Sequence, residues 1–415
     1  MLKNIRVAEF ALNVAGPYCG MMLADLGADV VKVERPGRGD TSRAWGTWAD
    51  RKRSVMFLSA NRNKRSLAMD IQKPEGLAAA KKLIATSDVV IESMSPGVAE
   101  RLGIGFEAAK ALRPDVIYVS VSGYGQVGPM AKEGGFDSMI QAYTGLMDMT
   151  GPEGAPPSRV PVSSLDYMTG CVAFGGVMAA LLRREQLRAA GKTAPAQRVD
   201  ASLYDAAINF LSPFLTEAAM TGRVQTRSGG ELHYVYPYGV FATRDGHLSL
   251  GIGSDNLWRK FCPAFDVTPL MDDPRFARNE QRVANRAELR ALLEPIFAGM
   301  TLEEALARTK AAGLPATPVR TIDANLVDEH MKIRQGLDYV DVSHPTPAKA
   351  PIAASPVRLT PPAGPGPAVA PPPLGADSLA VLEDLGYGPT EVRALMSQGI
   401  VAAEEAPARP AMEKV

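Results

Sequence analysis

The stretch Ala24-Asp25-Leu26-Gly27-Ala28-Asp29-Val30-Val31-Lys32-Val33-Glu34 decides the fold class, because it joins the end of a helix to a buried strand. Residues Met21–Gly27 carry apolar side chains at helical spacing and close on a glycine, a common helix stop. Residues Asp29–Glu34 are rich in β-branched side chains, which favour a strand. A further apolar strand, Ile5–Phe10, comes before the helix. The chain therefore opens with a β-α-β unit.

The same alternation continues downstream of this unit. Pro74–Ile84 has the spacing of a helix, and Asp88–Glu92 and Val116–Val121 have the composition of strands. Strands separated by helix-length segments are typical of a parallel sheet. The sequence predicts an α/β fold with a doubly wound parallel sheet. Its site loops are expected where the strands end at their carboxyl side.

The pattern changes after Asp200, which predicts a second, smaller domain. Tyr238–Thr243 and His247–Ile252 flank Arg244-Asp245-Gly246, a hairpin signal, and helical segments follow. We therefore expect a small α+β domain that interrupts the large one. The expected parts are a large α/β domain (1–200), a linker (201–225), the small α+β domain (226–325), a return segment completing the large domain (326–402) and a disordered tail (403–415).

Charge and cysteine content exclude several classes of protein. The 415 residues include 45 Lys plus Arg and 45 Asp plus Glu, and this balance argues against bulk electrostatic binding of nucleic acid or anionic membrane. The 3 cysteines are far apart and form no metal or disulfide motif. The N-terminus lacks a signal-peptide run, and the apolar stretch Tyr167–Leu182 is too short and glycine-rich for a membrane span. We expect a cytoplasmic protein without nucleic-acid or membrane partners.

One glycine motif raises a competing interpretation. Gly123-Tyr124-Gly125-Gln126-Val127-Gly128 fits the dinucleotide pattern after a predicted strand, and Asp148 lies at about the right distance for a ribose contact. However, Pro129 and Gly134–Gly135 interrupt the helix that such a site requires. The motif favours a strand-end loop over a nicotinamide site. The 4 histidines are scattered, so no metal site is expected.

Asp166 is the candidate carboxylate for nucleophilic catalysis. It precedes a helix expected to begin near Tyr167, where aspartate commonly caps the first turn. The helix dipole would also keep the carboxylate ionised, and a partly desolvated carboxylate is a usable nucleophile. The small residues Thr169, Gly170 and Cys171 would let a bulky substrate approach the backbone. Capping and nucleophilic catalysis both remain open from the residues alone.

Segments along nearly the whole chain occur in the order found in one enzyme family. They resemble the class III CoA-transferases, which include formyl-CoA and carnitine CoA-transferases and are related to α-methylacyl-CoA racemase. The matching segments are Glu9-Phe10, Ala15-Gly16-Pro17, Ala24 to Glu34, Asn63-Lys64-Arg65-Ser66, Pro96-Gly97, Arg101-Leu102-Gly103, Ser122-Gly123-Tyr124-Gly125, Gly128-Pro129, Gly135-Phe136-Asp137, Asp166 with Gly170, Gln197-Arg198-Val199-Asp200, and Leu374-Gly375 with Leu385-Gly386-Tyr387.

The resemblance implies a set of site residues in a CoA-binding large domain. Asp166 falls on the catalytic aspartate, and Arg38 and Arg101 fall on arginines near the CoA phosphates and nucleotide. A family lysine is replaced by Gln72, so a phosphate contact there would come from Lys73. The remaining positions expected to line the CoA site are Val14, Ala15, Met69, Ser93, Met94 and Ser95. The family further implies an interlocked homodimer, with acyl-CoA as a substrate and no tightly bound cofactor.

Two departures from the family patterns narrow the expected reaction. Phe136 stands where the racemase branch has a histidine, and phenylalanine cannot shuttle a proton. Val14 replaces a glutamine of formyl-CoA transferases, and only Gly229-Gly230 remains of their glycine lid. The resemblance implies a CoA-transferase that moves CoA from an acyl-CoA, such as succinyl-CoA, to a small carboxylic or dicarboxylic acid through aspartyl anhydride and aspartyl-CoA thioester intermediates. The alternatives are an acyl-CoA racemase or isomerase, a nicotinamide-dependent oxidoreductase and a non-catalytic CoA-binding protein.

Overall fold

The chain forms two compact units in a computed structural model that describes residues 1–49, 53–342, 348–360, 366 and 368–404. Unit 1 contains Met1–Thr144, Val160–Leu215 and the described residues from His330 onward. Unit 2 contains Gly145–Arg159 and Thr216–Glu329. The sequence prediction placed the first of these two segments of unit 2 within the large domain. The expected disordered tail lies outside the described residues from position 405 onward.

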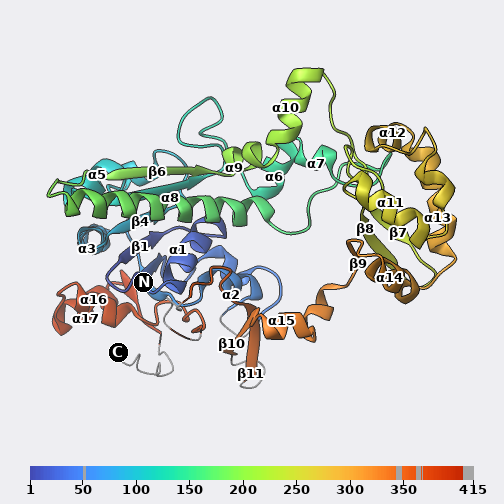
Figure 1. Cartoon of the computed structure of the whole chain (residues 1–415). Coiled ribbons are helices and arrows are strands. Elements are labelled where there is room, and N and C mark those ends of the chain that lie inside the picture. The colour runs from blue at the N-terminus through green and yellow to red at the C-terminus, as the bar shows by residue number, and fades with distance from the viewer. Residues whose placement is uncertain (50–52, 343–347, 361–365, 367, 405–415) are drawn as a thin grey trace. The chain divides into compact units, whose positions relative to one another are not determined.

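Unit 1 is built on a 7-stranded sheet with the order β12-β3-β2-β1-β4-β5-β6. Figure 1 labels β1, β4 and β6 of this sheet. Strands β1 to β6 are parallel, and β12 pairs antiparallel with β3. The predicted α/β fold with a large parallel sheet is confirmed. The strand bounds are β1 Arg6–Phe10, β2 Asp29–Glu34, β3 Arg65–Met69, β4 Val89–Glu92, β5 Ile117–Ser122, β6 Gln197–Ser202 and β12 Val401–Ala402.

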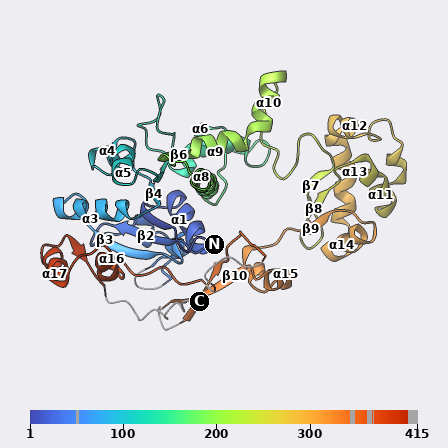
Figure 2. The same ribbon diagram turned by 60° about the vertical axis from the view of Figure 1, so that its left-hand side comes forward.

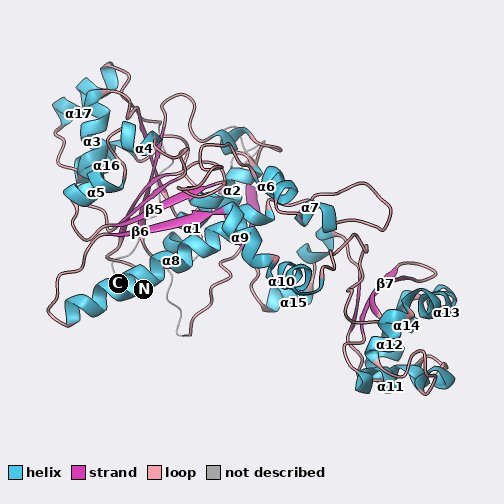
Figure 3. Cartoon of the chain, turned by 90° about the horizontal axis from the view of Figure 1, so that it is seen from above, coloured by secondary structure: helices cyan, strands magenta, loops and turns pink. Residues whose placement is uncertain are grey.

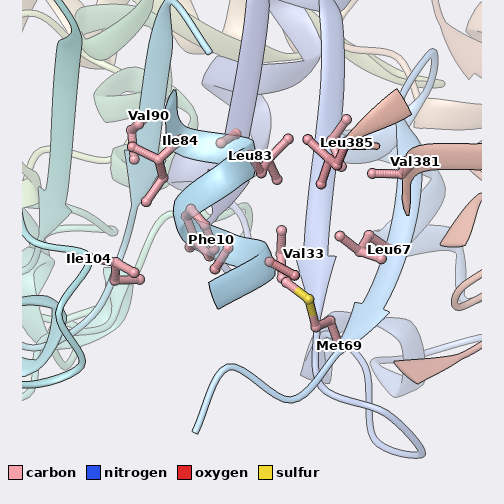
Figure 4. Packing of buried hydrophobic residues seen from close by; sticks show 14 of the residues in the cluster. Phe10, Val33, Leu67, Met69, Leu83, Ile84, Val90, Ile104, Val381 and Leu385 are labelled. Carbon is pink, nitrogen blue, oxygen red and sulfur yellow. The ribbon is translucent and has the colours of Figure 1, made fainter. Parts of the chain in front are cut away.

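One face of the sheet packs against helices α3 (Pro74–Ala85), α5 (Phe106–Leu112), α16 (Ser378–Asp384) and α17 (Pro389–Ser397). Alternate strand residues such as Phe10, Val33 and Leu67 point into this core, where they meet Leu83 and Val381 (Figure 4). All five side chains are buried. The C-terminal helices therefore contribute to the same core as the first strands.

The opposite face of the sheet packs against α1 (Ala15–Asp25) and α8 (Ser164–Ala189). A Cβ placed on Gly16 of α1 would lie 3.7 Å from Ile91, and one on Gly176 of α8 would lie 2.7 Å from Val199. Ile91 and Val199 are both in register with Val119 of β5, so they share one face. Helices thus cover both faces of the sheet, as Figures 2 and 3 show from two further directions.

Helix α8 has 26 residues, and an 18-residue window within it has the apolar composition of a membrane-crossing helix. Its predicted start near Tyr167 was wrong by three residues, because the helix begins at Ser164. The argument that the apolar stretch is too short to span a membrane also fails at this length. The buried residues of α8, among them Ala173 and Val177, lie on the side that packs on α1, β5 and β6. This is the packing of a core helix.

The other described elements of unit 1 lie in the connections of the sheet and along the returning chain. Helix α10 (Ser212–Thr221) crosses the division between the units, as does α15 (Glu329–Ile333). The remaining bounds are α2 Val55–Asn61, α4 Val98–Arg101, α6 Asp137–Tyr143, α9 Leu203–Phe210, β10 Leu337–Val342 and β11 Ala348–Ala353.

Unit 2 contains a 3-stranded sheet, β7-β8-β9, with antiparallel pairing throughout. The predicted hairpin is present as β7 (Tyr238–Ala242) and β8 (His247–Gly251), and β9 is Ala316–Pro318. Its core contains the stacked aromatic side chains of Trp258 and Phe261. The helices of this unit are α7 Leu146–Met149, α11 Asp255–Ala264, α12 Asn279–Ala284, α13 Arg286–Ala298 and α14 Leu302–Ala311.

Candidate active site

The strand order of unit 1 places a topological switch point between β1 and β4. The connections from these two neighbouring strands leave toward opposite edges of the sheet, and ligands of open α/β sheets bind beyond the carboxyl ends of such strands. The loops that follow β1 and β4 are joined here, because the Leu12 amide donates a hydrogen bond of 2.9 Å to Ser93 Oγ. Val14 and Ser93, both predicted at the CoA site, therefore lie in these two switch-point loops.

The predicted CoA-site residues lie at or beyond the carboxyl ends of four neighbouring strands, β1 to β4. Val14 is the N-cap of α1 and Ala15 its first residue, Arg38 follows β2, and Met69 ends β3. The structure therefore brings the set to one edge of the sheet. Gln72 and Lys73 come after β3, Ser93, Met94 and Ser95 come after β4, and Arg101 ends α4 beyond that loop.

The cationic members of this set are available to a ligand. Arg38, Lys73 and Arg101 are exposed, and none of their side chains forms an ion pair with a residue in the described ranges. Arg38 lies between Gly37 and Gly39, whose positive φ angles of 73° and 63° bend the loop. Three unpaired cations at the carboxyl-end edge provide a setting for phosphate groups.

A buried lysine ties the loops after β1 and β2 together. Lys32 Nζ donates to the carbonyl oxygen of Ala11 at 2.7 Å and lies 2.9 Å from Asp40 Oδ2. Asp40 in turn accepts a hydrogen bond of 3.1 Å from the Asn13 amide. Burial disfavours the charge on Lys32, but Asp40 and Glu9 hold its pKa above the ordinary value. This network fixes the loop that leads to Val14.

A second buried lysine anchors the start of helix α1. Lys64 Nζ donates to Glu9 Oε1 at 2.9 Å and to the Pro17 carbonyl oxygen at 2.7 Å. Burial lowers the pKa of Lys64 to about 8. A Cβ on Gly20 would lie 1.9 Å from Glu9 Oε2, so only glycine leaves room for this buried carboxylate. Glu9, Pro17 and Lys64 belong to segments that carry the family resemblance, and their contacts fix the start of α1.

Asp166 lies in the first turn of α8 and does not cap the helix. The N-cap is Ser163, and no side-chain capping bond is present there. In the part of the chain that the structure describes, no residue forms a hydrogen bond or ion pair with the half-buried Asp166 carboxylate. Burial, with the charge of Asp137, raises the pKa of Asp166 to about 7. Of the two roles left open by the sequence, this geometry does not support capping, and desolvation outweighs the helix dipole in setting the pKa.

A carboxylate and an amide side chain position the turn that carries Asp166. Asp137 Oδ2 accepts a hydrogen bond of 2.8 Å from the Leu165 amide, and Asp137 Oδ1 accepts one of 2.6 Å from Gln141 Nε2. Gln141 Oε1 accepts a hydrogen bond of 2.9 Å from the Val160 amide. We call Asp137 and Gln141 the helix clamp. Gln141 was not predicted from the sequence, and its only signal there is its spacing of four residues from Asp137 on α6.

Gly170 serves helix packing, so the expectation that it admits substrate to the backbone is wrong. A Cβ at this position would lie 2.8 Å from the Ala15 carbonyl oxygen and 2.9 Å from the Tyr18 ring. Helix α8 therefore lies close against the first turn of α1. Tyr18 also meets Tyr167 edge-on, with ring centroids 4.8 Å apart. The turn that bears Asp166 is thereby held beside the Val14–Ala15 loop.

The glycine motif after β5 does not form a dinucleotide site. A Cβ on Gly123 would lie 2.8 Å from Gly135 Cα, so these two backbones require glycine to pack together. No helix follows the motif until α6 begins at Asp137, whereas a dinucleotide fingerprint opens a helix directly. Asp148, the candidate ribose ligand, lies in unit 2 and pairs with Arg227 at 2.7 Å.

Two other expectations concern proton transfer and metals. Phe136, which replaces the racemase histidine, is the N-cap of α6 and is 58% exposed. Among the described residues, no group of three or more His, Cys, Asp or Glu side chains is arranged to hold a metal ion. The candidate groups in the described residues are therefore Asp166, the helix clamp and the cations beyond the carboxyl ends of the strands.

Comparison with known proteins decides the family. Residues 2–378 match CoA-transferase family III. The chain belongs to CoA-transferase family III. Succinyl-CoA:glutarate CoA-transferase of Mus musculus is 33% identical over 406 residues, covering 97% of this chain and 91% of that protein. Succinyl-CoA--D-citramalate CoA-transferase of Chloroflexus aurantiacus is 34% identical over 337 residues, covering 81% and 82%.

Solved structures of the family share the fold. The crystal structure of a CaiB/BaiF family protein from Brucella suis matches with a TM-score of 0.78 and 31% identity, covering 92% of this chain and 99% of that one. The predicted family and the predicted enzyme class, a class III CoA-transferase, are therefore confirmed. CoA thioesters are the substrates of such a family III enzyme.

Proposed function

We propose that this family III enzyme transfers CoA from succinyl-CoA or a similar acyl-CoA to a small dicarboxylic acid, with Asp166 as the nucleophile. The similarity to the succinyl-CoA:glutarate and succinyl-CoA--D-citramalate enzymes supports this choice of donor and acceptor. The replacement of the racemase histidine by Phe136 supports group transfer over α-proton exchange.

One observation carries the assignment of Asp166. Its carboxylate is half-buried and has no hydrogen-bond or ion-pair partner among the described residues. The helix clamp bonds the turn that carries it, and the close contact of Gly170 with Ala15 packs this turn against α1. A buried carboxylate without a hydrogen-bonding partner is energetically unfavourable in the resting protein. It is also a better nucleophile than a solvated one, because no shell of water or donors has to be removed.

The proposed reaction conserves the energy of the thioester in covalent intermediates. The Asp166 carboxylate attacks the acyl carbonyl, which gives an aspartyl acyl anhydride and CoA thiolate. The thiolate then attacks the aspartyl carbonyl, which gives an aspartyl-CoA thioester and releases the donor acid. The acceptor carboxylate attacks this thioester, forming a second anhydride and CoA thiolate. Attack of the thiolate on the acceptor's acyl carbonyl releases the new acyl-CoA and restores the Asp166 carboxylate.

The side of the sheet formed by the carboxyl ends of the parallel strands is the proposed binding surface for CoA. Arg38, Lys73 and Arg101 would neutralise the phosphates, because all three are exposed cations without an ion pair to a described residue. The loops after β1 and β4 would approach the pantetheine part, since they meet at the switch point through Leu12 and Ser93. Buried Lys32 and Asp40 keep the first of these loops in place.

We also propose the homodimer implied by the family resemblance. Large apolar side chains on α8 and α9 are exposed in the single chain, including Val172 at 53%, Leu182 at 61% and Phe210 at 55%. Apolar side chains grouped on neighbouring helices are typical of an obligate interface between subunits. Sedimentation of the purified protein tests this part of the proposal.

A trapping experiment tests the nucleophile. The enzyme is incubated with succinyl-CoA and then with hydroxylamine, and tryptic peptides are analysed by mass spectrometry. We expect a hydroxamate on Asp166 and transfer of CoA to glutarate. Asp166→Asn should lose transfer by several orders of magnitude, since an amide forms neither anhydride nor thioester. Asp205→Asn is the matched control, because Asp205 is also the third residue of its helix, α9.

Two results would contradict the proposal. One is a hydroxamate on a different carboxylate, and the other is an Asp166→Asn enzyme, free of deamidation, that still transfers CoA. A panel of acids including glutarate, succinate, oxalate and acetate tests the acceptor class separately. Efficient transfer to acetate with none to any dicarboxylic acid would exclude the proposed acceptor while leaving the nucleophile intact.

A further inference from the structure

Unit 2 contains a cavity of about 520 Å³. Its lining includes Gly229 and Gly230, the glycine pair discussed in the sequence analysis, but none of the residues proposed to bind CoA or to react. Its walls come from four places in this unit, namely the loop at Pro152–Glu153, the segment 226–233, Val240 of β7 and the start of α13. The volume lies within the range of pockets that hold small organic ligands.

The walls of this cavity are rich in guanidinium groups. Arg227, Arg286 and Arg290 line it, against the two carboxylates of Glu153 and Glu231. Arg290 is neutralised, because it pairs with both Glu231 and Glu294. Arg286 is less well paired than Arg290, because its Nη1 lies 3.9 Å from Glu231 Oε2, at the limit of an ion pair.

Two side-chain nitrogens on the walls have unmet hydrogen-bonding capacity. Arg227 Nε and His233 Nε2 are buried and have no partner among the residues that the structure describes. Arg227 forms an ion pair with Asp148, in which its Nη1 donates to the carbonyl oxygen and to Oδ1, both at 2.7 Å, and its Nε is left for a ligand. Arg286 is oriented by its Nη2, which donates to the His233 carbonyl oxygen at 2.5 Å. A ligand with acceptor oxygens would satisfy such donors.

We propose that this cavity binds a small dicarboxylate anion, with one carboxylate at Arg227 and the other at Arg286. Guanidinium groups pair with carboxylates through two parallel hydrogen bonds, which no other cationic side chain does. The two arginines come from separate walls, so each can bind one of two linked carboxylates. The cavity is also larger than one phosphate, which therefore fits it less well than a dicarboxylate does. Arg286 is also the first residue of the 13-residue helix α13, whose N-terminus adds positive potential.

The same ligand chemistry has two sources. The anion is either the acid substrate or a free dicarboxylate that binds without reacting. The first of these alternatives rests on the function proposed above. Binding at equilibrium is common to both sources, whereas the effect on turnover differs between them. The experiment therefore measures binding first and turnover second.

Binding is measured by calorimetric titration of glutarate into the full-length protein without acyl-CoA. We expect Arg227→Gln and Arg286→Gln each to weaken binding by at least 10-fold, because each removes one charge-assisted carboxylate contact. Arg244→Gln is the matched control, since Arg244 is a 59% exposed arginine of the same unit outside the cavity walls. Absence of glutarate binding, or equal affinity of all four proteins, would overturn the proposal.

A second measurement avoids any dependence on the folding of the variants. Phenylglyoxal modifies accessible arginines, and the wild-type protein is treated with it in the presence of glutarate or of butyrate, which has one carboxylate. Mass spectrometry should show protection of Arg227 and Arg286 by glutarate alone. Equal modification of both arginines in the two samples would overturn the proposal.

Steady-state kinetics then separate the two sources. If the cavity holds the acid substrate, Arg227→Gln should raise the KM for the acid at least 10-fold and leave the KM for acyl-CoA unchanged. If it holds a non-reacting dicarboxylate, both KM values should stay constant, and the variant should lose the response of the rate to an added dicarboxylate that accepts no CoA. A protein without any CoA transfer would refute the proposed function. The calorimetric titration and the phenylglyoxal experiment would still show whether the cavity binds a dicarboxylate.

Discussion

Asp137 accepts a hydrogen bond of 2.8 Å from the amide of Leu165, the residue directly before Asp166. The carboxylate that positions the turn is thus also the negative charge that acts on the proposed nucleophile. Asp137 is 4% exposed and shares its second oxygen with Gln141. Among the described residues, Asp137 is held by donors and Asp166 has none, and this difference supports the proposal that Asp137 positions the turn and Asp166 reacts.

The rate of acylation should depend on the ionisation of Asp166. Because only the carboxylate attacks the thioester, kcat/KM for acyl-CoA should rise with pH and level off above an apparent pKa of about 7, the pKa of Asp166. Asp137→Asn removes the neighbouring negative charge, so the midpoint should move to lower pH. A pH profile measured between pH 5 and 9 checks both, and an unchanged midpoint would contradict the coupling.

The buried charge of Asp166 should reduce stability at neutral pH. Its pKa is raised to about 7 in the folded protein, so protonation favours folding and stability falls as pH rises from about 4 through 7. Asp166→Asn removes this deficit, and the variant should exceed the wild type by about 1–4 kcal/mol at pH 8 and by little at pH 4. Urea unfolding at both pH values measures the difference. A variant that is less stable at pH 8 would support a capping role instead.

Replacing Arg38 or Arg101 by alanine should raise the KM for acyl-CoA more than the KM for the acid. Arg38→Ala and Arg101→Ala should each raise the KM for acyl-CoA by about 10-fold, as expected for the loss of one charge-assisted phosphate contact. The KM for the acid should change much less. Arg358→Ala is a suitable control in the same unit, since Arg358 is an exposed arginine that bonds the Gln335 carbonyl oxygen. Equal weakening of both substrates would contradict the assignment.

Two glycines of α8 should respond in opposite ways to the same substitution. Gly170→Ala introduces a Cβ 2.8 Å from the Ala15 carbonyl oxygen, so it should destabilise the protein by about 1–3 kcal/mol and lower activity. Gly175→Ala meets no atom within 4 Å and should stabilise the helix by up to about 1 kcal/mol. Thermal unfolding of the two variants provides the comparison, and a neutral Gly170→Ala would show that α1 and α8 are not closely packed there.

The sequence predicted those strands in which β-branched and other apolar residues predominate. Strands β1, β2, β4 and β5 lie within one residue of their predicted ends. Strand β3 was not predicted, because its first two residues, Arg65 and Ser66, are polar. In the structure Arg65 pairs with Asp29 and Ser66 bonds to Glu34. Such contacts depend on neighbours in the sheet, and a single segment does not reveal them.

The candidate site was predictable in its residues but not in its geometry. Aspartate near a helix start is a capping signal, and the sequence alone does not show that Ser163 precedes the first turn or that Asp137 bonds the Leu165 amide. Gly170 looks like an opening for substrate until the Ala15 carbonyl oxygen is placed beside it. The cavity of unit 2 was not foreseen, since Arg227 and Arg286 are remote in sequence and meet only through folding.

The pairing of β12 with β3 determines the order in which unit 1 can be completed during synthesis. Val401 pairs with Met69, so the strand that covers the edge of the sheet leaves the ribosome more than three hundred residues after its partner. Until then β3 presents unpaired amide and carbonyl groups, which are a template for association with other chains. Nascent chains interrupted before this point would expose that edge, and a chaperone that shields it during translation would raise the yield of native enzyme.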